Sequence, residues 1–291
     1  MSTVHVPVLP REVLELLDPQ PGQVLVDGTA GGGGHLRMLA ERVGPTGWVL
    51  GIDRDPAAIG RLEKSLAGLP VQLFSGSYLE LPEVLKELEQ PSVDGILLDL
   101  GLSSDQLADR ERGFSFNLDG PLDLRFNPQS GEPAWRLLQR IRAETLADLI
   151  YRYGEERYSR RIAAAIVESR RDDPIQTSRQ LADLVRRVVP SHPKDRIDPA
   201  TRTFQALRIA VNHELEHLER ALERLPDCLR IGGKLAVISF HSLEDRLVKE
   251  AFLDHHRWQK LTRKPVGADE TEIQQNPRSR SAKLRVAERS A

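Results

Sequence analysis

The sequence predicts an α/β fold: a mostly parallel sheet of seven strands, covered by helices and interrupted by an all-helical insertion. Up to Asp99 the chain alternates short apolar runs with stretches in which apolar residues recur at helical spacing. Near-continuous apolar strands of this kind are typical of a parallel sheet buried on both faces. Helical patterns then replace the alternation, and strand patterns return near the C-terminus, which indicates an insertion into one domain.

Each predicted element follows from its local pattern. Apolar runs predict strands at 24–26, 48–52, 71–74, 93–98 and 232–240, with two weaker strands within 258–264 and 282–288. Helical spacing predicts a helix that begins near His35 and others over 55–66, 79–88, 134–150, 155–171, 178–189 and 203–225. We therefore expect residues 1–105 and 200–291 to form one discontinuous α/β domain around a helical insertion of residues 106–199.

Two of these helices carry sequence signals for their first turn. Thr177 and Gln180 have the spacing of a capping box, in which each side chain bonds the other residue's backbone N–H. Ser242, followed by Asp245 three residues later, is the predicted cap of the helix after the fifth strand.

Composition limits the class of protein. Of 291 residues, 40% are hydrophobic and 29% are charged, and the net charge is −2, which is ordinary for a globular protein. No apolar run approaches the ~18 residues that a membrane helix needs, and the N-terminus lacks the basic and apolar regions of a signal peptide. Cys228 is the only cysteine, which excludes an intramolecular disulfide and a cysteine metal cluster. We therefore expect a cytoplasmic protein.

The stretch VLVDGTAGGGGHL, residues 24–36, places four consecutive glycines between the first strand and its helix. Glycines here let a ligand approach the backbone and leave N–H groups free at a helix N-terminus. A flexible turn is the alternative, but four glycines cost folding entropy that such a turn does not require. No register completes the dinucleotide pattern G-x-G-x-x-G. Asp27, Thr29, Gly31 and Gly33 instead resemble the D-x-G-x-G-x-G motif of S-adenosylmethionine-dependent methyltransferases, with Thr29 replacing the first glycine.

Carboxylates follow three of the predicted strands. Asp27 suits the amino group at the methionine end of that cofactor, while glycine N–H groups suit its carboxylate. Asp53 can accept hydrogen bonds from two ribose hydroxyls, a feature that an NAD enzyme would share, and a helix-capping aspartate is the alternative. Asp99 ends the fourth strand, beside the glycine loop in this topology, and is the best-placed carboxylate for chemistry.

Two more side chains are candidates for contact with the cofactor. Tyr78 follows the third strand and can lie against an adenine ring, although a core aromatic residue would give the same pattern. Gln106 either reaches the cofactor or completes a capping box with Ser103.

The segment HELEH, from His213 to His217, matches the H-E-x-x-H spacing of zinc proteases. The surrounding helix is long and strongly charged, and no third-ligand motif follows. A solvated helix with incidental histidines is the better interpretation, so we predict no metal site.

Taken together, motifs along nearly the whole chain resemble the bacterial 16S ribosomal RNA cytosine-N4 methyltransferases. The matching segments are HVPVL, DGTAGGGGH, GIDRDP, DGILLDLGLSS, ERGFSF, DGPLDLR, YGEERY, RIAAAIV, ATRTFQALRI, SFHSLEDRLVK and NPRSRSAKLR. The resemblance implies a Rossmann-like class I S-adenosylmethionine-dependent methyltransferase fold. It also implies cofactor contacts at Gly33, Gly34, His35, Asp53, Tyr78, Asp99 and Gln106.

The resemblance implies the reaction as well: methyl transfer from S-adenosylmethionine to the exocyclic N4 of a cytidine in the decoding region of 16S ribosomal RNA. The amino group of cytosine is a poor nucleophile because its lone pair is delocalised into the ring. Acceptors on its two hydrogens would stabilise the positive charge that develops, and proton removal can follow the transfer. We expect Asp99 to contact the cofactor and the amino group, and His241, at the end of the fifth strand, to contact the substrate.

RNA contacts are expected in the insertion and near the C-terminus. Within the insertion, residues 109–128, with Phe114, Phe116 and Arg125, can close over the base. The candidates for phosphate contacts are Arg278, Arg280, Lys283 and Arg285, for which a solvated strand edge is the alternative. We expect the small ribosomal subunit as partner, with no membrane and no DNA. A methyltransferase for another acceptor, and an RNA-binding protein with a relic cofactor site, are the competing functions.

Overall fold

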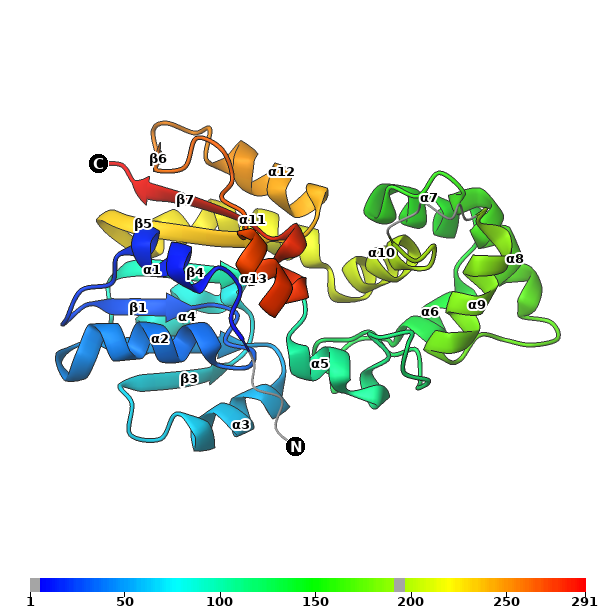
Figure 1. The fold of residues 1–291 in the computed structure, drawn as a ribbon, viewed down its shortest axis with the longest axis horizontal. Coiled ribbons are helices and arrows are strands. Elements are labelled where there is room, and N and C mark those ends of the chain that lie inside the picture. The colour runs from blue at the N-terminus through cyan, green and yellow to red at the C-terminus, as the bar shows by residue number, and fades with distance from the viewer. Residues whose placement is uncertain (1–5, 191–196) are drawn as a thin grey trace. The chain divides into compact units, whose positions relative to one another are not determined.

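The computed structural model describes residues 6–190 and 197–291 (Figure 1). It divides into two compact units, one of Met1–Ser103 with Leu215–Ala291 and the other of Ser104–Glu214. Residues 1–5 lie outside the described part of the chain. They begin the N-terminal stretch that we interpreted as lacking the features of a signal peptide. No helix among the described residues is both long and apolar enough to cross a lipid bilayer.

The first unit, which we call the α/β unit, contains a seven-stranded sheet in the order β3-β2-β1-β4-β5-β7-β6. Strands β1 to β5 pair in parallel, and β7 runs antiparallel to both β5 and β6. The strands are β1 (Val24–Asp27), β2 (Trp48–Asp53), β3 (Val71–Ser75), β4 (Val93–Asp99), β5 (Leu229–Ser239), β6 (Trp258–Lys260) and β7 (Lys283–Arg289). The predicted α/β fold with a mostly parallel sheet of seven strands is confirmed.

Alternate strand residues face opposite sides of the sheet and enter two separate cores, as the pleat requires. Leu25 and Leu97 belong to one core, whereas their neighbours Val26 and Leu98 belong to the other. Helices α1 (Pro10–Leu17), α2 (Gly34–Val43) and α3 (Pro56–Ser65) contribute to the first core, and α4 (Leu81–Glu87), α11 (Glu214–Cys228) and α12 (Ser242–Ala251) to the second. Both faces of the parallel strands are therefore covered, which explains their continuous apolar runs.

The sequence did not predict a short helix that the structure has near the C-terminus. Residues between the last two predicted strands form α13 (Glu270–Gln275), which begins at Asp269. The Asp269 Oδ1 accepts a hydrogen bond of 2.8 Å from the N–H of Glu272. An acidic segment of six residues has no apolar stripe, so periodicity cannot reveal such a helix.

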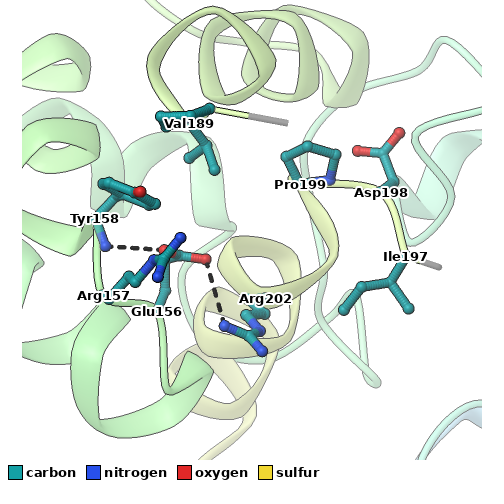
Figure 2. A pocket seen from close by; sticks show the side chains of 9 residues that line it. Glu156, Arg157, Tyr158, Val189, Ile197, Asp198, Pro199 and Arg202 are labelled. Atoms are coloured by element: carbon teal, nitrogen blue, oxygen red, sulfur yellow. Dashed lines mark hydrogen bonds and ion pairs between the residues drawn. The ribbon is translucent and has the colours of Figure 1, made fainter. Parts of the chain in front are cut away.

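The second unit, which we call the helical unit, lies between β4 and β5 in the chain. Its helices are α5 (Ser104–Ala108), α6 (Ala134–Arg140), α7 (Ala143–Gly154), α8 (Ser159–Ser169), α9 (Ser178–Val188) and α10 (Thr201–Asn212). The predicted capping box is confirmed, because Thr177 and Gln180 bond each other's backbone N–H at the start of α9. The single helix predicted over 134–150 is two helices, α6 and α7. A cavity among the ends of these helices is shown in Figure 2.

Helix α10 belongs to the helical unit. The C-terminal boundary of this unit therefore lies at residue 214, whereas the sequence suggested residue 199. α10 packs against α7, and Gly154 is needed at this contact: a Cβ there would stand 2.5 Å from the carbonyl oxygen of Arg202. The predicted long helix over 203–225 is wrong as one element. His213 adopts a left-handed conformation (φ 52°) that ends α10, and α11 begins at Glu214.

This break also bears on the H-E-x-x-H motif. The motif binds zinc by placing both histidines on one face of a continuous helix. Because the backbone leaves the helical conformation at His213, His213 and His217 do not share a helix. The spacing in the sequence thus carries no argument for zinc.

Candidate functional site

The four glycines form a tight connection from β1 to α2. Gly31 (φ 48°) and Gly33 (φ 80°) both adopt left-handed conformations that other residues rarely take, and Gly33 is the N-cap of α2. A Cβ at Gly33 would also lie 2.4 Å from the Cδ2 of Leu62. The helix therefore begins at Gly34 and His35 with backbone N–H groups that lack partners within the helix, as suits an anionic ligand group.

The two acids of GIDRDP have separate tasks. One oxygen of Asp53 accepts a hydrogen bond of 2.7 Å from the N–H of Gly31, and the other accepts one of 2.8 Å from the N–H of Asp55. Asp55 caps α3 by accepting from the N–H of Ala57. The helix-capping interpretation thus applies to Asp55. A carboxylate offers about four lone pairs, so Asp53 fixes the glycine loop and keeps acceptor capacity for ribose hydroxyls.

Thr29 links the ends of two neighbouring strands. Its Oγ1 accepts a hydrogen bond of 2.6 Å from the N–H of Asp99 and lies 3.4 Å from the Oδ1 of Asp27, to which it donates. A glycine, which the general methyltransferase motif has here, could form neither bond. Sequence reasoning noted the replacement but did not predict this role.

Asp99 faces His35 at the centre of the site. The Nδ1 of His35 lies 3.5 Å from the Oδ2 of Asp99, while its Nε2 lies 2.8 Å from the carbonyl oxygen of Val8. The carbonyl can only accept, so Nε2 carries a hydrogen. Asp99 Oδ1 is buried and has no hydrogen-bond partner among the described residues.

Burial shifts the protonation of this group of residues. Desolvation raises the pKa of Asp99 to about 7, against the opposing effect of the Arg278 charge, and raises the pKa of Asp27 to about 6. The pKa of Asp53 is raised and the pKa of His35 is lowered for the same reason. A cationic ligand would favour the ionised form of these carboxyl groups and offset the cost of their burial. The site is therefore suited to a positively charged molecule.

The remaining predicted cofactor residues fall in different units. Tyr78 opens the 3-10 helix Tyr78–Glu80 after β3. Its Cβ lies 2.9 Å from where a Cβ of Gly28 would stand, so it borders the glycine segment. Gln106 lies in α5 of the helical unit and is buried. Its cofactor contact stays a prediction.

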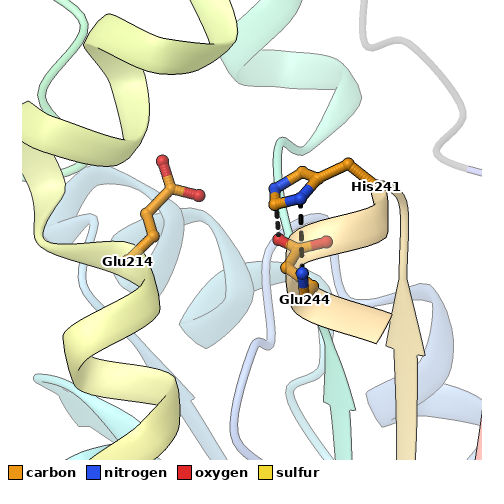
Figure 3. Close-up of side chains that lie close together, drawn as sticks. All are labelled: Glu214, His241 and Glu244. Atoms are coloured by element: carbon orange, nitrogen blue, oxygen red, sulfur yellow. Dashed lines mark hydrogen bonds and ion pairs between the residues drawn. The ribbon is translucent and has the colours of Figure 1, made fainter. Parts of the chain in front are cut away.

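His241 lies two residues after the end of β5 and caps the next helix, as Figure 3 shows. Its Nδ1 accepts from the N–H of Glu244 at 3.4 Å, and its Nε2 lies 3.2 Å from the Oε1 of Glu244. The other carboxylate oxygen of Glu244 accepts from the N–H of Phe240. The predicted cap Ser242 is therefore wrong by one residue. His241 has a structural task, and its contact with substrate stays a prediction.

The four basic residues predicted to bind phosphate have different surroundings. Arg285 is buried and pairs with Asp245 at 2.7 Å, and Lys283 lies 3.4 Å from the same carboxylate. Arg278 donates to the carbonyl of Leu102 and acts electrostatically on Asp99. Arg280 is the exposed residue of the four, and its contact with RNA stays a prediction. Sequence reasoning did not find Arg278 beside Asp99, because the two are distant in the chain.

The aromatic residues of the 109–128 segment pack within the helical unit. Phe114 lies against Phe126, with ring centroids 5.8 Å apart, and Phe116 lies edge-on to Phe204 at 5.2 Å. Arg125 forms two hydrogen bonds with Asp123, of 2.8 Å and 2.6 Å. Closure of this segment over a base stays a prediction.

Fold and site together define a class of protein. The strand order reverses between β1 and β4, which is where open α/β sheets bind their ligands. There the structure places a glycine loop, a helix N-terminus and the carboxylates of Asp27, Asp53 and Asp99. These features are those of a Rossmann-like S-adenosylmethionine-dependent methyltransferase, in which the glycine loop and Asp53 would hold the methyl donor.

Comparison with known proteins identifies the family. The chain belongs to the MraW methylase family, whose model matches residues 2–290. It is 51% identical to the ribosomal RNA small subunit methyltransferase H of Rhodopirellula baltica, over 99% of this chain and 92% of that protein. It is also 51% identical to the protein of the same name from Deinococcus radiodurans, over 99% of this chain and 90% of that one.

A solved structure shares the fold. The crystal structure of PH0851 aligns with a TM-score of 0.51 and 14% identity, over 98% of this chain and 46% of that chain. Membership of the MraW methylase family makes this protein a methyltransferase, and S-adenosylmethionine is its methyl donor.

Proposed function

We propose that this protein methylates the exocyclic N4 of a cytidine in the decoding region of the 16S ribosomal RNA of the small subunit. Membership of a methylase family and a site suited to a cationic methyl donor support the reaction. The names of relatives 51% identical over nearly the full chain support small-subunit ribosomal RNA as the substrate. The cytidine and its N4 atom are supported by the chain-long set of motifs described above.

The unpartnered oxygen of Asp99 is the observation that carries the chemistry. Asp99 Oδ1 is buried without a hydrogen-bond partner among the described residues, at the carboxyl end of β4. A buried acceptor left unpaired costs roughly 1–3 kcal/mol, and a substrate N–H would remove this cost. An amino group brought against Asp99 would therefore meet an acceptor already in place.

The Asp99 acceptor would compensate for the poor nucleophilicity of the cytosine amino group. S-adenosylmethionine supplies an electrophilic methyl group when it is bound. Asp99 would accept a hydrogen from the cytosine amino group, which favours a pyramidal nitrogen and stabilises the positive charge that forms as nitrogen attacks carbon. Asp99 can also take up the proton released after transfer, because its pKa is raised by burial to about 7.

His35 assists Asp99 by its orientation. The bond between Nε2 and the Val8 carbonyl holds the imidazole with Nδ1 toward Asp99. Neutral Nδ1 carries a lone pair, so it can receive a hydrogen bond from the protonated carboxyl group. Asp99 thus gains a partner for the proton that it takes up, and we assign His35 the role of a positioning residue.

The reaction and its target are tested by labelled S-adenosylmethionine with small subunits purified from a strain that lacks the gene. We expect label in RNA, and N4-methylcytidine as the labelled nucleoside after digestion. Label in ribosomal protein, in another nucleoside, or in no component would contradict the proposal. Subunits from the parent strain are the control, since their target site is already modified.

The role of Asp99 is tested by Asp99→Asn and Asp99→Ala, with cofactor affinity measured separately by calorimetry. We expect turnover to fall by about 100-fold or more in both variants, as when one preorganised stabilising group is removed. A variant that turns over at the wild-type rate with cofactor saturating would remove Asp99 from the chemistry.

A further inference from the structure

The helical unit contains a cavity that the methyl-transfer site does not use. Its volume is about 300 Å³, which is the lower end of the range for small-ligand sites. Figure 2 shows the side chains around it. The lining residues come from the turn before α8, the end of α9 and the start of α10: Glu156, Arg157, Tyr158, Val189, Pro190, Ile197, Asp198, Pro199 and Arg202.

One wall of the cavity is a stacking surface. The guanidinium carbon of Arg157, which lines the cavity, lies 4.7 Å from the centroid of the Tyr158 ring. The guanidinium carbon of Arg161 lies 5.7 Å from the same centroid, although Arg161 does not itself line the cavity. Both arginines are exposed, and neither forms an ion pair with any residue that the structure describes. By contrast, Arg186, which lies over Phe116, pairs with Asp183 and Asp198. Arg157 and Arg161 therefore keep their charge available to an anion.

A buried carboxylate forms the polar edge of the same cavity. Glu156 is 4% exposed, and its Oε1 accepts a hydrogen bond of 2.8 Å from the N–H of Tyr158. Its Oε2 forms an ion pair with Arg202, whose Nη1 lies 4.0 Å away, beyond the distance of a hydrogen bond. Figure 2 shows this carboxylate between the tyrosine turn and α10. Glu156 thus has acceptor capacity that the fold does not use.

Apolar surface completes the cavity. Ile197 is 54% exposed although it is a large aliphatic residue, and Val189 and Pro199 also line the cavity. An aromatic ring with one cation in the cavity wall and a second beside it, a buried acceptor and an apolar wall would together suit a flat ring that has N–H donors on its edge and carries an anionic group. A nucleotide with an amino or imino group on its base has this chemistry.

We propose that this cavity binds one unpaired nucleotide of the RNA substrate, distinct from the nucleotide that is methylated. The base would stack on Tyr158 and the adjoining guanidinium groups, Glu156 would accept from its amino or imino edge, and Arg157 and Arg161 would meet phosphate. Single-stranded RNA is bound in this way, by aromatic and guanidinium stacking with contacts to the base edge. The proposal rests on the proposed function, because it takes RNA as the substrate.

The test compares two tyrosines of the helical unit. Tyr158→Leu removes the stacking ring, Tyr158→Phe keeps it, and Tyr151→Leu removes a tyrosine that is 62% exposed and does not line the cavity. Steady-state methylation of small subunits gives KM and kcat, and calorimetry gives cofactor affinity. We expect Tyr158→Leu to raise the KM for subunits by about 5- to 100-fold, with kcat and cofactor affinity unchanged. Tyr158→Phe and Tyr151→Leu should stay within about twofold of wild type.

The double variant Arg157→Gln/Arg161→Gln tests the phosphate contacts. It should lower the slope of log KM against log salt by about 1.4, at about 0.7 for each phosphate of a single strand. Ultraviolet cross-linking of the wild-type protein to small subunits should attach a nucleotide to the peptide that contains Tyr158. An unchanged KM in Tyr158→Leu, an equal rise in Tyr151→Leu, or cross-links that avoid this peptide would each overturn the proposal. A wild-type protein that fails to methylate RNA would instead overturn the proposed function.

Discussion

His35 Nδ1 and Asp99 Oδ2 lie 3.5 Å apart, and the opposite ring nitrogen of His35 is fixed on the Val8 carbonyl. This relationship brings together three distant parts of the chain: the segment before α1, the first turn of α2 and the end of β4. It also explains why an imidazole is buried at the start of α2, since the glycine loop alone requires no side chain there. Asp99 has a neighbour that orients it without neutralising it.

The first prediction concerns stability against pH in the cofactor-free protein. Burial raises the pKa of Asp99 from 3.8 to about 7, so the folded state holds this proton more tightly than the unfolded state. The stabilising contribution is complete below pH 3.8 and is lost as pH rises through about 7. The Asp99→Asn variant should not show this pH-dependent loss of stability. From pH 5 to pH 8, wild type should lose about 2–3 kcal/mol of unfolding free energy relative to the variant, at ~1.4 kcal/mol per pKa unit.

Urea denaturation at both pH values measures this difference in unfolding free energy. If wild type and Asp99→Asn kept a constant difference in unfolding free energy over this range, Asp99 would not be the titrating group.

The second prediction concerns protons released on cofactor binding. The sulfonium and amino groups of S-adenosylmethionine are cationic, and a nearby positive charge favours ionised carboxyl groups. Because burial raises the pKa of Asp27 to about 6 and that of Asp99 to about 7, binding near pH 6.5 should release about one proton. Calorimetry in buffers of different ionisation enthalpy measures this number. Asp99→Asn should release fewer protons, and net proton uptake by wild type would contradict the electrostatic argument.

The third prediction concerns the glycine loop. Gly33→Ala introduces a residue at φ 80° and places a Cβ 2.4 Å from Leu62, so unfolding free energy should fall by about 2–4 kcal/mol. Cofactor affinity should fall as well, because the start of α2 must move. Gly60→Ala is the matched control: it lies within α3 and has no atom within 4 Å of the added Cβ. That control should gain about 0.5–1 kcal/mol. Equal changes in unfolding free energy for Gly33→Ala and Gly60→Ala would show that a side chain does not strain the loop.

The fourth prediction separates the two possible roles of His241. Its Nδ1 caps α12, and asparagine is a good N-cap whereas alanine is not. His241→Ala should lower unfolding free energy by about 1 kcal/mol, and His241→Asn should be close to wild type. If His241 also contacts the substrate, turnover should fall in both variants. Full activity in the stable His241→Asn variant would leave His241 as a cap alone.

Sequence reasoning located the strands well because buried parallel strands produce apolar runs that few other elements produce. It also found the strand-end carboxylates, because a polar residue after such a run is easily recognised. It could not find the bond between Thr29 and Asp99, the carbonyl of Val8 beside His35, or Arg278 beside Asp99, because each joins residues that only the sheet topology brings together. The break at His213 was missed for a related reason. A left-handed residue other than glycine or asparagine leaves little signal in the sequence, so apolar spacing on both sides suggested one helix.

The fifth prediction concerns the basic segment near the C-terminus. Arg280 is exposed, whereas Arg285 is buried in an ion pair with Asp245. Arg280→Gln should leave stability unchanged, weaken binding to small subunits, and lower the slope of log affinity against log salt by about 0.7–0.9, as loss of one phosphate contact predicts. Arg285→Gln should instead lower unfolding free energy by about 2–3 kcal/mol. This loss is smaller than when a buried carboxylate is left with no partner, because Lys283 remains near Asp245. Equilibrium binding at several salt concentrations, together with urea denaturation of both variants, makes the comparison. If Arg280→Gln bound RNA with an unchanged salt slope, the segment would be a solvated strand edge and not an RNA contact.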